Sequence, residues 1–339
     1  MTLATGIGSL PGPGDRDAAQ AYAEAVRTVL GELGEPPGLP YLPELPGRGA
    51  GAAMTGRALA VVAGLAADLQ PAGWRLVDAV GVDQRRARSL LAQDLDQLEE
   101  QAQGFAGPFK VQVAGPWTLA ATVEKPRGDK VLADHGARRD LAQALAEGVA
   151  GHVADLRRRL PDASRLVVQV DEPALAAVLA GGVPTASGFG RHRVVHPPEA
   201  SAALEWVLGA VADAGAEPWV HACAPGTPLD LLRGAGARGL AVDPDVLSAA
   251  DHDVLGATLE AGETVVLGVV PVTDPAAPLE DSRLVERVLR WLDMLGFDPE
   301  EVAGSLVVSP GCGLAGASPE WARRATGLAR GTARALTAG

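Results

Sequence analysis

The chain has 339 residues, of which 47% are hydrophobic and 21% charged, and its formal net charge is −13 at pH 7. Nucleic acids are held largely by clustered lysine and arginine, so this acidic balance argues against a nucleic-acid partner. No stretch approaches the ~20 apolar residues of a membrane span, and the start lacks the features of a secretory signal. We therefore expect a cytoplasmic protein without a membrane partner.

Apolar residues spaced for one helical face recur along the chain and predict nine helices. Their expected ranges are 15–33, 55–70, 83–103, 137–160, 198–214, 227–236, 247–262, 280–295 and 318–337. Thr227 and Ser318 each precede a proline that opens a helix-forming run, so both are expected to be N-terminal caps.

Short apolar, β-branched runs lie between the helices and are typical of parallel strands covered on both faces. They occupy residues 4–8, 39–43, 109–115, 165–171, 218–222, 239–243, 265–269 and 305–309. Eight strands alternating with helices predict a (β/α)₈ barrel, and no linker divides the chain, so residues 1–339 are expected to form a single domain.

Residues suited to chemistry follow these strands repeatedly, and barrel enzymes carry their sites at the carboxyl ends of the strands. The residues in question are Ser9, Glu44, Asp171, Glu172, His221, Cys223, Asp243 and Cys312. Together they outline one site at one rim of the barrel.

His221 and Cys223 end a strand one residue apart, so their side chains lie on the same side of an extended backbone. Imidazole nitrogen and thiolate sulfur suit Zn²⁺, and Cys312 with Asp243 would complete four ligands. The motif alone is also compatible with ordinary structural residues. The second cysteine, within the sequence PGCG at another strand end, favours a metal.

The chain resembles the C-terminal catalytic barrel of cobalamin-independent methionine synthase, and more closely its short single-barrel relatives. The resemblance rests on GIGSLP at 6–11, AGPWTL at 114–119, QVDEPAL at 169–175, HAC at 221–223 and SPGCGL at 309–314.

This resemblance implies zinc bound by His221, Cys223, Asp243 and Cys312. The family's carboxylate is usually glutamate, so Asp243 is a departure, and Asp245 is its nearest rival. The substrate-binding residues implied for homocysteine are Ile7, Gly8, Ser9, Glu44 and Asp171, and Asp171 is also the expected catalytic residue. Coordination to zinc would hold the substrate as a thiolate, the nucleophilic form of a thiol.

The methyl donor is less well specified, because the chain lacks three residues that the full-length enzyme uses with methyltetrahydrofolate. Ala177, Thr122 and Thr273 stand near those positions, and Thr273 replaces a proton-donating histidine. A methylcorrinoid would not need that acid, so the sequence favours it over methyltetrahydrofolate. The competing interpretation is that Trp117, Glu124 or a histidine of 190–196 fills the missing roles.

Two other functions stay open: a corrinoid-linked methyltransferase acting on another thiol, and a non-catalytic barrel with a structural zinc. Several remaining residues have plainer interpretations. Glu172 is expected to face solvent or form a rim salt bridge, His135 and His152 to lie on the surface, His192 and His196 to lie in an exposed loop, and Trp117 to serve packing.

Overall fold

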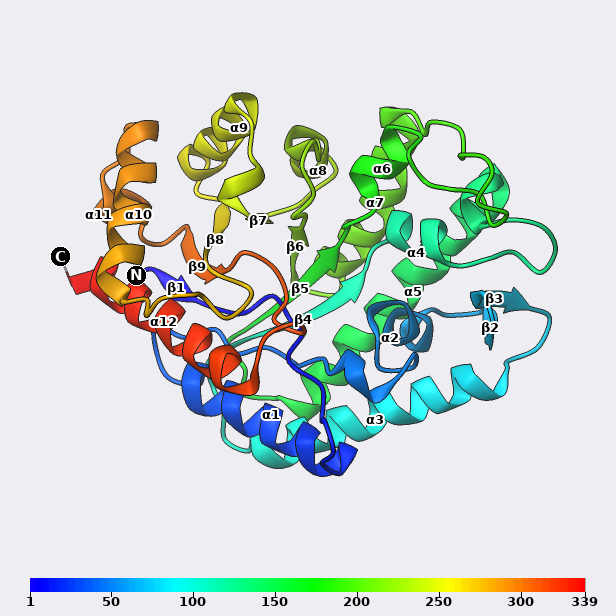
Figure 1. Cartoon of the computed structure of the whole chain (residues 1–339), viewed down its shortest axis with the longest axis horizontal. Coiled ribbons are helices and arrows are strands. Elements are labelled where there is room, and N and C mark those ends of the chain that lie inside the picture. The colour runs from blue at the N-terminus through cyan, green and yellow to red at the C-terminus, as the bar shows by residue number, and fades with distance from the viewer. Residues whose placement is uncertain (339) are drawn as a thin grey trace.

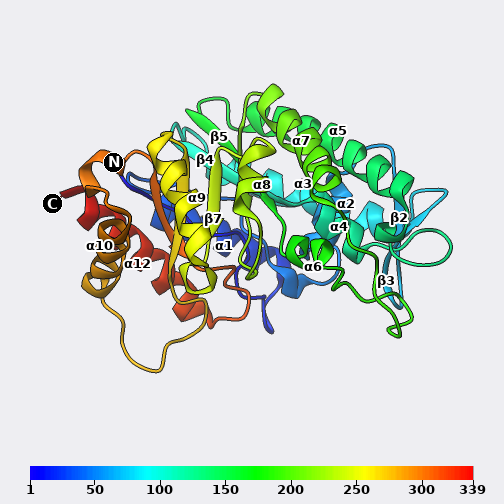
Figure 2. The same ribbon diagram turned by 90° about the horizontal axis from the view of Figure 1, so that it is seen from above.

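The computed structural model describes residues 1–338, and its centre is a parallel sheet of seven strands in the order β1-β9-β8-β7-β6-β5-β4. The strands are β1 (Leu3–Ala4), β4 (Pro108–Ala114), β5 (Arg165–Asp171), β6 (Glu217–His221), β7 (Gly239–Val242), β8 (Thr264–Val270) and β9 (Leu306–Pro310). Because β1 pairs with β9, the first strand joins the last, and the two termini lie beside each other (Figures 1 and 2).

Helices surround this sheet, with α1, α3 and α12 on one side and α7 to α10 on another (Figure 1). Their bounds are α1 (Ala18–Leu33), α2 (Met54–Val61), α3 (Val82–Gln101), α4 (Pro116–Thr122), α5 (His135–Arg159), α6 (Leu175–Leu179), α7 (Pro197–Asp213), α8 (Leu229–Gly234), α9 (Ala249–Glu260), α10 (Asp281–Leu295), α11 (Pro299–Val302) and α12 (Pro319–Ala338). None of the helices in residues 1–338 is long and apolar enough to cross a bilayer.

The prediction of a closed eight-stranded barrel is wrong at its second strand. Residues 37–44 make isolated bridges in place of a ladder: Gly38 with Ala4 of β1, Tyr41 with Lys110 of β4, and Glu44 with Ser9. Prolines at 37, 40 and 43 supply no N–H donor, which prevents a regular ladder here. The remaining donors still bond to both neighbours: Leu39 N–H to the carbonyl of Ala4 at 2.7 Å and Leu42 N–H to that of Lys110 at 3.0 Å.

The predicted helix over 55–70 is also wrong in its second half. The helix α2 ends at Val61, and an antiparallel hairpin follows, formed by β2 (Ala66–Gln70) and β3 (Gly73–Val77). This hairpin lies at the far end of the molecule from the termini (Figure 2). Gly64 adopts a φ angle of +67°, which side-chain-bearing residues avoid, so the helix does not continue through it.

The two predicted helix caps have different outcomes. Ser318 accepts a hydrogen bond from Trp321 N–H at 3.0 Å and begins α12, as predicted. Thr227 does not cap α8, because its hydroxyl instead donates to the carbonyl of Ala224 at 2.8 Å.

Two apolar clusters fill the interior. The larger one lies where the helices pack on the sheet, and a smaller one joins residues from successive strands. The members of the smaller cluster are Ile7, Leu39, Val167, Trp219, Ala241, Val266 and Val307. Because side chains alternate along a strand, the residues two and four positions after Val167 continue on this face, and they are polar: Gln169 and Asp171. The inner face of the sheet therefore changes from apolar to polar toward the carboxyl ends of its strands.

Candidate active site

The polar end of this inner face brings together residues from strands that are distant in sequence. Asp171 ends β5 and His221 ends β6, and the two are directly paired in the parallel register. Cys223 follows β6 by two residues, and Cys312 follows β9 by two residues. The four side chains thus meet at one edge of the sheet, where the sequence predicts the site.

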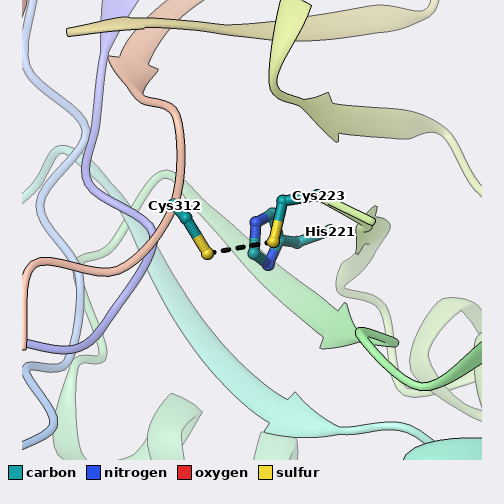
Figure 3. Close-up of side chains that lie close together, drawn as sticks. All are labelled: His221, Cys223 and Cys312. Carbon is teal, nitrogen blue, oxygen red and sulfur yellow. Dashed lines mark hydrogen bonds between the residues drawn. The ribbon is translucent and has the colours of Figure 1, made fainter. Parts of the chain in front are cut away.

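His221, Cys223 and Cys312 come together closely. Their ligand atoms all lie within 4.8 Å of one another. Within the described part of the chain, no other group of three or more His, Cys, Asp or Glu residues is so compact. The two sulfur atoms are 3.0 Å apart. Figure 3 shows the two cysteine side chains pointing toward each other, with the imidazole of His221 beside them.

The imidazole of His221 is held on one side only. Its Nδ1 lies 3.1 Å from Oδ1 of Asp171, and both side chains are buried. Its Nε2 is buried and has no hydrogen-bond partner. Burial lowers the pKa of His221, but the hydrogen bond with Asp171 and the nearby sulfur of Cys312 outweigh that effect and raise the pKa to about 9.

These atoms fit a zinc ion by their chemistry. A buried polar atom without a partner is costly, and the lone pair of a neutral imidazole is a zinc ligand. A carboxylate that holds the other ring nitrogen is the usual support for such a ligand. His221 Nε2 with the two sulfur atoms would supply three ligands, and Asp171 would supply the support.

The two thiols influence each other. The hydrogen bond from Cys223 lowers the pKa of Cys312, and the nearby His221 adds to this effect against the opposing effect of burial. The same contact, together with burial, raises the pKa of Cys223. Cys312 is therefore the sulfur that ionises first, and the imidazole of His221 balances its charge.

The expected fourth ligand lies outside this group. Asp243 accepts a hydrogen bond from the N–H of Asp245 at 2.9 Å, and its Oδ2 lies beside Gly311, so near that a Cβ on that glycine would be 3.1 Å away. Asp245 is exposed and forms an ion pair with Arg287 at 2.5 Å. Of the two carboxylates, Asp243 is thus the one next to the loop that carries Cys312.

The expected amino-acid cradle lies beside the loop that carries Cys312, because the carbonyl of Ser9 accepts a hydrogen bond from the N–H of Leu314 at 2.9 Å. Ser9 and Glu44 form a parallel bridge, and the N–H of Glu44 donates to the carbonyl of Gly8 at 3.0 Å. Gly8 has a φ of +154° and packs on Gln112, whose side chain lies 2.7 Å from where a Cβ would be. A larger residue at position 8 would therefore displace the loop.

Glu44 is buried and belongs to an ion-pair network that the sequence did not reveal. Its Oε1 lies 3.2 Å from Nε of Arg57, which also contacts Asp94 at 2.6 Å. Arg48 binds both oxygens of Asp94, at 2.7 and 2.6 Å. Burial raises the pKa of Glu44, and the guanidinium of Arg57 opposes that rise.

Glu172 is neither solvent-facing nor in a rim salt bridge, so that prediction is wrong. It is fully buried and accepts hydrogen bonds from Trp117 N–H at 2.8 Å and from Thr118 N–H and hydroxyl at 2.8 and 2.6 Å. The carboxylate thus satisfies the first turn of α4. Burial raises its pKa to about 7, against these hydrogen bonds.

The histidine predictions are confirmed in part. His135 lies on the surface in contact with Glu199, His152 is half-buried, and His196 is exposed. His192 is buried rather than exposed, with Nε2 3.2 Å from Asp129.

Trp117 and Glu124, which could replace the family's missing folate-binding residues, both make hydrogen bonds to other parts of the protein. The buried indole N–H of Trp117 donates to the carbonyl of Ala200 at 3.0 Å, in line with its predicted packing role. Glu124 binds Arg75 of the hairpin, with Nε to Oε2 at 2.9 Å. The hydroxyl of Thr122 donates to the carbonyl of Thr118 at 2.7 Å, while Thr273 and Ala177 are exposed.

Comparisons with solved structures place this fold among known ones. A B12-independent methionine synthase from Shewanella sp. W3-18-1, solved with selenomethionine, matches with a TM-score of 0.64 and 14% identity over 99% of this chain and 98% of that chain. GH5_18 from Streptomyces cattleya matches with a TM-score of 0.43 and 15% identity over 99% and 80% of the two chains. A 3-keto-D-glucoside 4-epimerase from E. coli reaches 0.36 and 10% over 74% and 95%. The first match shows that the two proteins share a fold.

Sequence comparison is more specific. No curated protein has a significantly similar sequence. The family described as "Cobalamin-independent synthase, Catalytic domain" matches residues 110–335, which include the three clustered side chains and Asp171. The match covers most of the chain, and the chain belongs to the cobalamin-independent methionine synthase family, whose members transfer a methyl group to homocysteine.

Proposed function

We propose that this protein is a zinc-dependent homocysteine S-methyltransferase that produces methionine. One observation carries the zinc assignment: the buried Nε2 of His221 has no hydrogen-bond partner and lies among the sulfur atoms of Cys223 and Cys312. In a family of homocysteine methyltransferases, such a group beside the buried acidic residues Asp171 and Glu44, at the carboxyl ends of parallel strands, supports a catalytic metal rather than a structural one.

In this proposal His221, Cys223 and Cys312 hold zinc, and Asp243 is the fourth ligand. When bound, zinc supplies a positive charge that keeps the substrate sulfur deprotonated. Asp171 keeps the proton of His221 on Nδ1, so that Nε2 presents its lone pair. Transfer forms the carbon–sulfur bond of methionine and breaks the bond between the methyl group and the donor.

The amino-acid end of homocysteine would lie beside the metal ligands. Glu44 and Asp171 are buried carboxylates suited to an ammonium group. Backbone groups of residues 7–9 suit the carboxylate, and the bridge between Ser9 and Glu44 holds the two halves of this cradle together.

The methyl donor is a separate assignment. The corrinoid favoured on the sequence gains no support from a family described as cobalamin-independent or from a structural relative named B12-independent. We therefore propose methyltetrahydrofolate. Its amine leaving group needs a proton, and Thr273 stands where the full-length enzyme has its histidine, so turnover should lose help worth about 10²- to 10⁴-fold.

Metal analysis and calorimetry test this function. The purified chain should hold about one zinc, as the site can hold a single ion, and Cys223→Ser and Cys312→Ser should lose it. Homocysteine should bind the zinc-loaded protein and add a sulfur ligand, visible in X-ray absorption at the zinc edge. Zinc retention by both variants would show that the proposed metal site is wrong. An unchanged spectrum at saturating homocysteine would show that homocysteine is not the substrate.

The donor is tested by assays with methyltetrahydrofolate and methylcobalamin under the same conditions. Slow folate-dependent methionine formation that exceeds the methylcobalamin rate supports the donor proposed here. Faster formation from methylcobalamin would show that the donor is a corrinoid. Methyl transfer to another thiol alone would indicate a corrinoid-linked methyltransferase for that thiol.

A further inference from the structure

Lys110 is an ionisable residue inside the sheet with no exposed surface. It lies in the middle of β4, where its neighbours Phe109 and Val111 are also buried. Burying an ammonium group is costly unless a partner compensates for the lost water. A lysine here is therefore explained only by what its Nζ contacts.

The Nζ of Lys110 makes two hydrogen bonds and, among the residues that the structure describes, no ion pair within 4.0 Å. It donates to the backbone carbonyl of Ile7 at 3.1 Å and to Oε1 of Gln169 at 2.9 Å. The Nζ also lies 5.3 Å from the centre of the Tyr41 ring. Both acceptors lead to the proposed active site.

The first acceptor belongs to the amino-acid loop. The carbonyl of Ile7 also accepts a hydrogen bond from Nε2 of Gln169 at 2.9 Å. Two buried donors therefore hold the backbone just before Gly8 and Ser9. Among residues 1–338 no other donor bonds to that carbonyl, so its orientation depends on Lys110 and Gln169 together.

The second acceptor leads to the metal ligands. Because Lys110 donates to Oε1 of Gln169, the amide nitrogen of Gln169 must face the other way, toward Oδ1 of Asp171 at 2.7 Å. The same Oδ1 contacts Nδ1 of His221 at 3.1 Å. A continuous series of hydrogen bonds thus runs from Lys110 through Gln169 and Asp171 to His221.

We propose that Lys110 is a positioning residue that holds two parts of the site in one arrangement: the loop for the amino-acid end of the substrate, through Ile7, and the metal ligand His221, through Gln169 and Asp171. This inference rests on the proposed function. A purely structural role is the alternative, and a neutral side chain of similar length would fill that role at least as well, because it carries no buried charge.

The test compares Lys110→Met with the wild type in three measurements. These are zinc affinity by chelator competition, homocysteine affinity of the zinc-loaded protein by calorimetry, and thermal unfolding of the metal-free protein. We expect zinc affinity to fall about 10-fold or more, as for other groups that support a metal ligand, and homocysteine affinity to fall as well. The metal-free protein should unfold at the same or a higher temperature.

A matched control separates positioning from stability. Leu166 packs in the larger core on β5 and makes none of these hydrogen bonds. Leu166→Ala should lower the unfolding temperature and leave zinc affinity at the wild-type value. If Lys110→Met instead loses stability and keeps wild-type affinities for zinc and homocysteine, Lys110 is structural and the inference is overturned.

Gln169→Glu provides a second variant in case Lys110→Met does not fold. Glutamate keeps the acceptor for Lys110 and pairs with its charge, which offsets the added carboxylate beside Asp171, but it removes the donor to both Asp171 and the carbonyl of Ile7. The variant should fold and bind zinc and homocysteine more weakly than the wild type, and wild-type affinities would overturn the inference. A wild-type protein that binds neither would instead remove the proposed function, so the two failures are distinguishable.

Discussion

Asp171 accepts hydrogen bonds from two side chains through a single oxygen: Oδ1 lies 2.7 Å from Nε2 of Gln169 and 3.1 Å from Nδ1 of His221. Asp171 was expected from the sequence to bind substrate, and it also ends a strand in register with a proposed metal ligand. One carboxylate therefore contacts the histidine while it remains close enough to the cradle to contribute charge there.

Asp171→Asn should weaken zinc binding by about 10- to 100-fold, because the amide keeps an acceptor but loses the charge that supports His221. Homocysteine should bind more weakly as well, since an ammonium group would lose one of two carboxylates. Chelator competition followed by calorimetry measures both effects. Unchanged zinc affinity would mean that the contact with His221 contributes nothing to the metal site.

The two candidate carboxylate ligands can be separated by a pair of variants. Asp243→Asn should release zinc at lower chelator concentration, since Asp243 lies beside the loop of Cys312. Asp245→Asn should retain zinc like the wild type, since Asp245 is exposed and pairs with Arg287. Metal content after dialysis against a series of chelator concentrations measures this difference. The reverse order would assign the ligand to Asp245.

Glu172→Ala should lower the free energy of unfolding by about 2–4 kcal/mol. The substitution leaves two backbone N–H groups and one hydroxyl of α4 buried without an acceptor, and each unsatisfied group costs about 1–3 kcal/mol before relaxation. Denaturant unfolding provides the measurement. Glu260→Ala, at the exposed end of α9, is the control and should change stability by less than about 0.5 kcal/mol.

The contribution of Lys110 to the free energy of unfolding should rise with pH, whereas that of a lysine in an ion pair falls. Burial lowers its pKa from 10.5 to about 7, against the carboxylates of Asp171 and Glu44. Between these two values the unfolded chain binds a proton that the folded chain does not, so the contribution of Lys110 to the free energy of unfolding rises with pH. Below the lower value both states are charged, and the folded state bears the full cost.

Compared with the wild type, Lys110→Met should therefore have its largest stability advantage at neutral pH and below. That advantage should shrink as pH rises toward 10.5, by up to about 1.4 kcal/mol per pH unit. Other titrating groups are common to both proteins and cancel in the difference. Denaturant unfolding of the metal-free proteins at several pH values tests this. A difference that does not vary with pH would show that Lys110 has an ordinary pKa when folded.

Much of the fold and the clustering of His221, Cys223 and Cys312 could be predicted, because both follow from local patterns. The alternation along β6 places His221 and Cys223 on one side, and parallel strands bring the end of β9 to the same edge. The prediction of the second strand was wrong because residues 39–43 have the composition of a strand but lack N–H donors at their prolines. The hairpin was not predicted because Leu65 and Leu69 are spaced as they would be on a helix.

The supporting residues could not be predicted, because their roles arise from contacts between distant segments. Lys110 meets Gln169 and Ile7, which are 59 and 103 positions away in sequence. Arg57 reads as an ordinary helix residue until the fold brings Glu44 and Asp94 to it. Glu172, next to a proline, resembles an exposed loop residue, and only its hydrogen bonds with Trp117 and Thr118 at the start of α4 explain its burial.

The pairing of β1 with β9 and the bonding of residues 37–44 to β4 have a consequence for solubility. Both ends of the seven-stranded sheet are covered by the first part of the chain. A truncated chain that begins at β4 would keep the matched catalytic region but expose β4 and β9 as open edges. Unpaired edges of apolar strands recruit strands from other molecules. The segment that carries the proposed substrate loop therefore also protects the sheet from self-association, and we expect a chain without it to aggregate.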